Sequence, residues 1–298
     1  MSDPSSETAR VRRATFVGAT AVLMWSTLAA LATFCARIPP LELLALSFGI
    51  AFALCALVWA VRGEDPRVHL RQPARAGLLG IGGLFGYHLL YFIALRLAPP
   101  VEANLLNYLW PLLIVVFSAL LPGERLRSWH VAGAAAGLAG TALLVTGGGG
   151  LAVRAEHAPG YLAAAGCAVL WAGYSVLSRR LGAVPTDAVG GFCLATSLLA
   201  LALHLLLERT VIPDATEATV LLVMGAGPVG GAFFAWDIGC KRGDLRALGA
   251  LSYATPLLST LLLVATGRPL SGGAVPVAAL LITGGAGLAS RDLWARRA

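Results

Sequence analysis

Ten long runs of apolar residues, separated by short polar segments, dominate the chain. The runs cover residues 14–36, 40–61, 76–97, 101–121, 129–147, 159–178, 187–207, 217–239, 245–266 and 273–290. A helix needs about 20 predominantly apolar residues to cross the hydrocarbon core of a bilayer. The segments between the runs are too short to fold as a soluble domain. The pattern therefore predicts an all-α membrane protein with ten transmembrane helices.

The composition indicates that lipid is the main solvent and argues against several other classes of protein. Apolar residues make up 58% of the chain and charged residues only 12%, whereas about 25% charge is usual for a soluble domain. The net charge of +7 is not gathered with aromatic residues on one segment, as a nucleic-acid interface would require. The five cysteines are odd in number and lack the spacing of a disulfide framework or a zinc site. We therefore expect no nucleic-acid partner, no metal and no cofactor.

The basic residues between the runs predict the orientation in the membrane. If the N-terminus is cytoplasmic, 17 of the 22 lysines and arginines lie on the cytoplasmic side and five lie outside. Positive charge accumulates on the cytoplasmic side of membrane proteins. The distribution predicts a multi-pass protein of the bacterial inner membrane with both termini in the cytoplasm, and it favours an even number of spans.

An internal repeat emerges when the sequence is shifted by about 145 positions. The motif Tyr-x-x-Pro at 108–111 falls on the same motif at 253–256, and Trp25 falls close to Trp171. The offset persists across most of both halves, which is stronger support than any single matching pair. Since five helices per half is an odd number, the second half must cross in the opposite sense.

The two halves, residues 1–150 and 151–298, are therefore predicted to be inverted five-helix repeats. Inverted repeats are typical of secondary transporters, and the substrate site lies near the midplane where interrupted helices of the two repeats meet. The third and eighth runs are rich in glycine, and the fourth and ninth contain Pro111 and Pro256. We expect these four helices to form the cavity wall. The alternative is that the glycines only permit close packing of helices.

Polar and aromatic side chains at mid-depth in the runs are the candidate substrate ligands. They are Tyr87, His88, Tyr91, Asn104, Tyr108, Trp110, Trp171 and Ser252. Asn104, Asn107 and Tyr108 share one face of a helix, where amides exposed to lipid would be unsatisfied. His88 is an ionisable group in an apolar interior, which makes it a functional candidate by default. The alternative reading is that these groups only hydrogen-bond neighbouring helices to one another.

Several of these segments resemble a known family. The two five-helix halves, the repeated Tyr-x-x-Pro motif and Pro-Gly-Glu at 122–124 resemble the drug/metabolite transporter superfamily, in particular its EamA-type branch. The strings at 86–92 and 104–111 are similar to those of bacterial aromatic amino-acid exporters. The resemblance implies export of aromatic amino acids. One departure is that Gly267–Pro269 stands where many relatives repeat the acidic residue Glu124.

The hypothesis is a secondary transporter that exports aromatic and other apolar amino acids, such as Phe, Trp and Tyr, by alternating access. The rings would form an apolar pocket, while His88, Asn104 and Ser252 would orient the charged amino-acid backbone, with His88 donating to the carboxylate. The alternative is an exporter of drugs or organic cations, which the same rings would attract, although no clear carboxylate lies at mid-depth. No motif of an enzyme site occurs in the chain, so we expect no enzymatic activity.

Other charged residues bear on coupling and assembly. Asp237 and Lys241 have i,i+4 spacing and predict an ion pair near the cytoplasmic boundary. Glu124 is expected to be a structural residue at the same boundary. His88 is then the one obvious proton site, which leaves facilitated diffusion open. The oligomeric state also stays open, and the sequence is compatible with a monomer.

Reporter fusions test the predicted topology. Fusions after Arg154 and Thr210 should report a periplasmic location, and fusions after Arg71 and Lys241 a cytoplasmic one, because basic loops are retained inside. Alkaline phosphatase and green fluorescent protein activities give the two readouts. Reversed readings at any two of these positions would overturn the predicted ten-span orientation.

Overall fold

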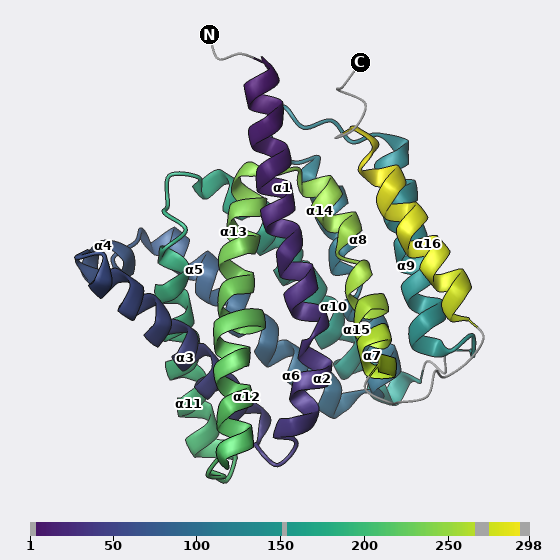
Figure 1. Ribbon diagram of the computed structural model, residues 1–298. Coiled ribbons are helices and arrows are strands. Elements are labelled where there is room, and N and C mark those ends of the chain that lie inside the picture. Colours follow the sequence, from purple (N-terminus) through teal and green to yellow (C-terminus); the bar gives the residue numbers. More distant parts are fainter. Residues whose placement is uncertain (1–3, 151–153, 266–273, 293–298) are drawn as a thin grey trace.

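The computed structural model describes residues 4–150, 154–265 and 274–292, and all regular structure in these ranges is helical. Figure 1 shows the helices packed side by side as one bundle. The first half of the chain forms α1 (Pro4–Ser26), α2 (Leu28–Ala32), η1 (Thr33–Cys35), α3 (Pro40–Val61), α4 (Pro66–Leu70), α5 (Ala74–Ile81), η2 (Gly82–Gly86), α6 (Tyr87–Leu97), α7 (Pro100–Asn107), α8 (Trp110–Ser118) and α9 (Ser128–Thr146). The second half forms η3 (Ala155–His157), α10 (Ala158–Ser178), η4 (Arg179–Leu181), α11 (Ala188–Leu207), α12 (Ala215–Ala226), η5 (Gly227–Gly231), α13 (Ala232–Arg242), α14 (Leu245–Leu251), α15 (Ala254–Ala265) and α16 (Val275–Ala289).

Eight helical segments of the described chain are long and apolar enough to cross a membrane. They are Ser6–Cys35, Pro40–Val61, Ala74–Leu97, Pro100–Ser118, Ser128–Thr146, Ala155–Leu181, Ala188–Leu207 and Ala215–Arg242. These segments correspond to the first eight predicted runs. The ninth run corresponds to α14 and α15, and the tenth to α16, a shorter apolar helix. The ends predicted at 266 and 273, and the segment Gly267–Pro269, lie outside the described residues.

Interruptions of the helices recur at the offset found in the sequence. The π-helical turns η2 and η5 lie inside longer helices and begin 145 residues apart. Two-residue turns that begin at Tyr108 and at Ser252 separate α7 from α8 and α14 from α15. Pro111 and Pro256 account for the second pair of interruptions, because proline has no N–H to donate and its ring displaces the carbonyl four residues earlier.

A residue of the second half satisfies the backbone at the interruption in the first half. In an unbroken helix the Leu112 N–H would bond to the carbonyl of Tyr108, but here it donates to the Tyr253 hydroxyl at 3.1 Å. Tyr253 is fully buried, and its ring lies directly against Gly137 of α9. Tyr253 therefore joins the turn between α14 and α15 to both α8 and α9.

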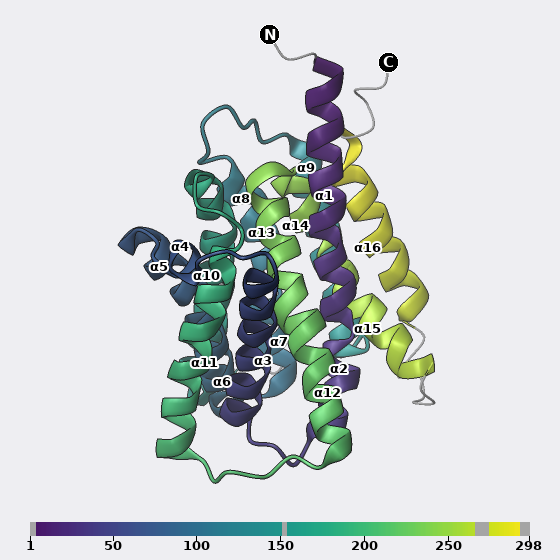
Figure 2. The same ribbon diagram turned by 60° about the vertical axis from the view of Figure 1, so that its left-hand side comes forward.

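Corresponding helices of the two halves lie beside one another and run in opposite directions. Gly133, near the start of α9, lies against Gly285 in the second half of α16, whereas Gly140 lies against Ala278 near its start. Figure 1 shows α9 and α16 side by side along their length. α3 and α11 are likewise neighbours (Figure 2), with the Ser197 hydroxyl donating to the Ala45 carbonyl at 2.7 Å.

The predicted ion pair of α13 is present. Lys241 Nζ lies 2.8 Å from Asp237 Oδ2, and the Thr186 hydroxyl donates to the same oxygen at 2.7 Å. The Lys241 and Asp237 side chains are only 6% and 3% exposed, and Lys241 also donates to the Val184 carbonyl. The pair is therefore buried against the connection before α11 rather than lying at the surface.

The close contact between α9 and α16 predicts that glycine substitutions there depend strongly on position. A Cβ at Gly133 would lie 2.5 Å from the Gly285 carbonyl oxygen, whereas a Cβ at Gly284 would meet nothing within 4 Å. Gly133→Ala should lower the melting temperature in detergent by the equivalent of about 1–3 kcal/mol, because the two backbones must move apart. Gly284→Ala, the matched control, should leave the melting temperature unchanged or raise it slightly. Equal effects of the two substitutions would mean that the helices do not pack this closely.

Candidate functional site

A cavity of about 440 Å³ lies between helices of the two halves. Its wall is dominated by aromatic side chains, namely Trp25, Tyr87, His88, Tyr91, Phe92, Tyr108, Trp110, Trp171 and Phe233. Among the described residues that line it there is no aspartate, glutamate, lysine or arginine. The cavity therefore offers rings and neutral polar groups but no full countercharge.

The structure brings the predicted site residues together, with one exception. Tyr87, His88, Tyr91, Asn104, Tyr108, Trp110 and Trp171 all line the cavity. Ser252 does not, because it is fully buried and its hydroxyl donates to the Leu248 carbonyl at 2.7 Å. Thr255 and Ser259 of α15 line the cavity in its place. The Ser252 hydroxyl therefore does not face the cavity, and the expectation that it orients the substrate was wrong.

The four helices expected to form the wall all contribute, but α1, α2, α3 and α10 do so as well. None of the glycines of the third and eighth runs lines the cavity. Some of them allow close packing instead, since a Cβ at Gly83 would lie 2.4 Å from the Tyr174 ring and one at Gly225 2.5 Å from Ile50. For these two glycines the structure supports the alternative reading, close helix packing, whereas a Cβ at Gly77, Gly82 or Gly227 would meet nothing within 4 Å.

Four tryptophans from four helices form a layer at the inner end of the cavity, meaning the end toward the N-terminus of α1. The Trp25 ring centroid lies 5.7 Å from that of Trp171, 6.4 Å from Trp110 and 5.1 Å from Trp236. Trp236 is fully buried, and its indole N–H donates to the Ser175 hydroxyl at 3.0 Å. Trp25 was absent from the predicted site, although its alignment with Trp171 in the repeat was the signal that could have identified it.

Hydrogen bonds between α6 and α7 fix one side of the cavity. The Tyr91 hydroxyl donates to Asn104 Oδ1 at 2.5 Å, and Asn107 Nδ2 donates to the Tyr87 hydroxyl at 3.1 Å. The two tyrosine rings are stacked, with centroids 6.1 Å apart. The predicted polar face of α7 thus both joins the neighbouring helix and lines the cavity, so the two readings of these residues are compatible.

The imidazole of His88 has a defined polarity. Its Nδ1 lies 2.7 Å from the Leu84 carbonyl oxygen, and a carbonyl can only accept a hydrogen bond. Nδ1 therefore carries the hydrogen, and Nε2 of the neutral ring is an acceptor. The ring is held edge-on to Phe48, with centroids 5.4 Å apart. A neutral His88 in this orientation cannot donate from Nε2 to a substrate carboxylate, so the role expected from the sequence would require the protonated ring.

The cavity extends from the tryptophan layer toward only one end of the bundle. The first residue of α1 that lines it is Trp25, and the last of α13 is Phe233. Ala32 and Pro40, on either side of the connection to α3, also line it. At the other end, where the first turn of α1 and the last turn of α16 lie (Figure 1), none of the described residues lines the cavity.

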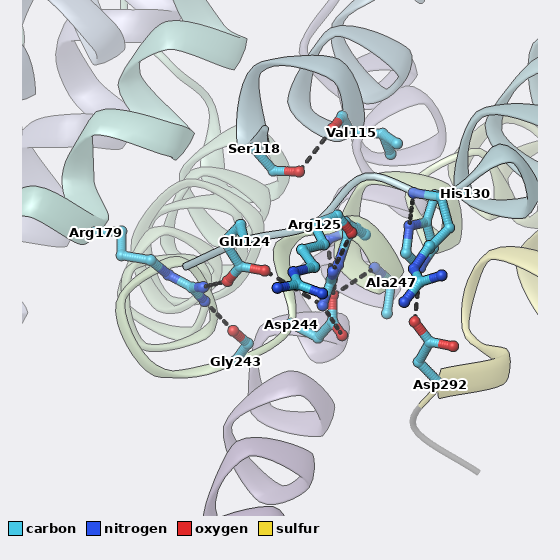
Figure 3. Close-up of polar contacts among 12 residues, drawn as sticks. Val115, Ser118, Glu124, Arg125, His130, Arg179, Gly243, Asp244, Ala247 and Asp292 are labelled. Carbon is cyan, nitrogen blue, oxygen red and sulfur yellow. Dashed lines mark hydrogen bonds and ion pairs between the residues drawn. The ribbon is translucent and has the colours of Figure 1, made fainter. Parts of the chain in front are cut away.

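At that other end, a cluster of ion pairs joins the two halves of the chain (Figure 3). Glu124, between α8 and α9, lies 2.6 Å from Arg179 and 3.3 Å from Arg246. Arg179 also donates to the carbonyl of Cys240 in the last turn of α13 and to that of Gly243, which follows α13. We call Glu124, Arg179 and Arg246 the ion-pair cluster.

Asp244 extends this cluster to α1. Its carboxylate accepts the backbone N–H groups of Arg246 and Ala247 at the start of α14, and its own N–H donates to the Thr15 hydroxyl at 2.8 Å. Burial alone would raise the pKa of Asp244. The hydrogen bonds and charge of Arg246 and the backbone N–H groups of α14 lower it by more, so the pKa lies below its usual value. Asp244 is therefore ionised at neutral pH.

One group of potential metal ligands lies away from the cavity in the described part of the chain. The ligand atoms of Glu64, His69 and Asp187 all lie within 4.8 Å of one another. Arg62 lies 3.9 Å from Glu64 and 3.8 Å from Asp187, so both carboxylates already have a cationic neighbour. We assign no metal to this group.

Comparisons with known proteins agree with these features. The model of the EamA-like transporter family matches residues 12–146 and again residues 158–291. A protein of Ancylobacter novellus named aromatic amino acid exporter YddG is 55% identical over 285 residues, which are 95% of this chain and 98% of that protein. The Escherichia coli protein of the same name is 27% identical over 84% of this chain and 87% of its own length. A crystal structure whose description names no function is 52% identical, with a TM-score of 0.90 over 96% of this chain and 99% of that one.

Proposed function

The chain belongs to the EamA-like transporter family, and we propose that it is a secondary transporter that exports aromatic and other apolar amino acids across the bacterial inner membrane. The observation that carries this proposal is the cavity, which is lined largely by rings and, among the described residues, by no aspartate, glutamate, lysine or arginine. Pockets for small molecules are generally apolar with a few placed polar groups. The two relatives named as aromatic amino acid exporters support the same substrate class and the direction of transport.

The lack of a charged wall favours an amino acid over an organic cation. A cation in an apolar cavity needs a buried partner, since removing an unpaired charge from water is costly. A zwitterionic amino acid has no net charge, and neutral hydrogen-bonding groups can satisfy its two ends. The drug or organic-cation alternative is therefore not favoured.

We further propose that the chain crosses the membrane ten times, as two inverted repeats with both termini in the cytoplasm. The double match to the family model supports the repeat. The recurrence of π-turns and helix breaks at the same offset supports it as well. The opposite directions of α9 and α16 support the inversion. Residues 1–150 and 151–298 would be the two repeats.

Alternating access would proceed by opening the end of the bundle that the ion-pair cluster holds together. The cavity reaches the tryptophan layer from the opposite end, so a substrate moving between the two sides must pass this layer. Glu124 belongs to the first half and Arg179 and Arg246 to the second. Separation of the halves at the cytoplasmic end would therefore break the ion-pair cluster first.

Transport in proteoliposomes tests the proposed function. The purified protein should catalyse saturable uptake of labelled Trp and Phe. Tyr108→Ala should raise the half-saturating concentration about tenfold, because loss of one ring contact and its buried area costs roughly 1–2 kcal/mol. Tyr161→Ala, outside the cavity, is the matched control and should leave uptake unchanged. Absence of saturable Trp and Phe uptake by the unaltered protein would sink the proposal.

Alkylation of buried native cysteines tests the gate. Cys240 and Cys193 are both fully buried, but only the Cys240 carbonyl is bonded to Arg179. In proteins that retain one of these two cysteines, Glu124→Gln should increase N-ethylmaleimide labelling of Cys240 about tenfold, the shift that a loss of roughly 1.4 kcal/mol would cause. Labelling of Cys193 should not change.

The control variant for the gate is Glu156→Gln. Glu156 also forms an ion pair with an arginine, Arg154, but both side chains are more than 60% exposed and lie outside the ion-pair cluster. This variant should leave both labelling rates as they are. If Glu124→Gln behaved in the same way, the ion-pair cluster would have no part in the gate.

A further inference from the structure

The polar groups of the cavity wall are unequally distributed between hydrogen-bond donors and acceptors. The neutral His88 presents Nε2 as an acceptor, because Nδ1 donates to Leu84 at 2.7 Å. The oxygen of the Asn104 side chain is already bonded to the Tyr91 hydroxyl at 2.5 Å. That oxygen keeps a second lone pair, but the NH₂ group of Asn104, which can only donate, has no hydrogen-bond partner among the described residues and is the group free to meet a ligand.

From this polarity we infer that the site fixes the direction in which an amino acid binds, with its ammonium group at His88 Nε2 and its carboxylate at the Asn104 NH₂ group. The inference rests on the proposed function, because it takes a zwitterionic amino acid as the substrate. It reverses the role that the sequence gave to His88 and retains that of Asn104. His88 lies on α6 and Asn104 on α7, so the two ends of the substrate would bridge these helices.

Asn107, one turn further along α7, holds the Tyr87 ring rather than offering an acceptor to a ligand. Its Nδ2 donates to the Tyr87 hydroxyl at 3.1 Å, and its Oδ1 is buried with no partner among the described residues. The Asn107 side chain lines the cavity and is 6% exposed, but the buried Oδ1 is not on the cavity surface. His88 Nε2 is therefore the acceptor assigned to the ammonium.

The absence of charged side chains strengthens the inference. Among described residues, no carboxylate lines the cavity that could bind the ammonium in place of His88. No lysine or arginine lines it that could take the carboxylate in place of Asn104. Neutral groups must then sort the two charged ends of the substrate, and they can do so only by their donor or acceptor character.

Analogues of tryptophan that lack one charged end separate the two roles. Tryptamine keeps the ammonium and lacks the carboxylate, whereas indole-3-propionate keeps the carboxylate and lacks the ammonium. Binding of all three compounds should be measured with the full-length protein in detergent, by calorimetry or by quenching of intrinsic fluorescence. The unaltered protein should bind tryptophan more tightly than either analogue, by at least tenfold.

The variants His88→Leu and Asn104→Ala should remove different preferences. In His88→Leu the preference for tryptophan over indole-3-propionate should fall to within about threefold, since the ammonium no longer has its acceptor. The preference over tryptamine should persist. Asn104→Ala should show the reverse pattern. If His88→Leu instead removed the preference over tryptamine, His88 would bind the carboxylate and the inference would be wrong.

Phe92→Leu is the matched control, because Phe92 lines the same cavity from the same helix as His88 but has no polar group. It should change the affinities for all three compounds by a similar factor and leave both preferences intact. If His88→Leu does not fold, His88→Phe keeps a planar ring without the acceptor and makes the same prediction. Failure of the unaltered protein to bind tryptophan would count against the proposed function itself, whereas unchanged preferences in both variants would refute only this inference.

Discussion

The constraint on which the architecture depends is that lipid cannot hydrogen-bond the backbone. Every interruption of a membrane helix frees N–H and carbonyl groups, which must find partners inside the protein. The interruption between α7 and α8 is possible because Tyr253 accepts the N–H of Leu112 at 3.1 Å. Tyr253 in turn needs a site beside its ring with no side chain, which Gly137 provides. One hydrogen bond between the halves thus allows α7 to end near mid-depth, beside the cavity.

Two kinds of packing follow from this arrangement and serve opposite purposes. At the outer contacts, glycines bring helix backbones together, as Gly133 does against Gly285. At the centre, large rings from several helices keep the backbones apart and leave a cavity between them. Trp25 and Trp171, which correspond in the repeat, meet there with centroids 5.7 Å apart. Contacts between corresponding helices of the two halves therefore occur both at the periphery and in the ring-lined wall.

In the described ranges, charged side chains lie at the ends of the bundle and in one buried pair. The ion-pair cluster holds one end together, whereas Arg37 and Glu217 form an ion pair between the halves at the other. Asp237 and Lys241 form a buried ion pair, with Nζ and Oδ2 2.8 Å apart, on the side of the tryptophan layer that faces away from the cavity. Apart from such pairs, ionised groups would be costly in the apolar interior. The cavity is left to neutral groups, whose selectivity comes from hydrogen-bond direction rather than from net charge.

The sequence by itself determined the helical segments, the repeat offset and seven of the residues that line the cavity. Hydropathy is a local property, so runs two to eight were placed within four residues of their ends, whereas the first helical segment begins at Ser6, eight residues before the predicted start. The offset located the helix interruptions because proline and glycine act on their own turn of the chain. The polar and aromatic side chains in the middle of the runs were recognisable as cavity residues because their polar groups would lack hydrogen-bond partners in lipid.

Only the tertiary structure decided which atoms of those residues are free. Ser252 has its hydroxyl turned to Leu248, and His88 has Nδ1 turned to Leu84, choices that depend on side-chain rotamers rather than on sequence spacing. The ion-pair cluster joins Glu124 to residues 55 and 122 positions away, a contact that no local pattern encodes. Hydropathy and periodicity report what a residue is and which face it occupies. The donor and acceptor directions that give a site its chemistry depend on the rotamers that the packing of the whole fold selects.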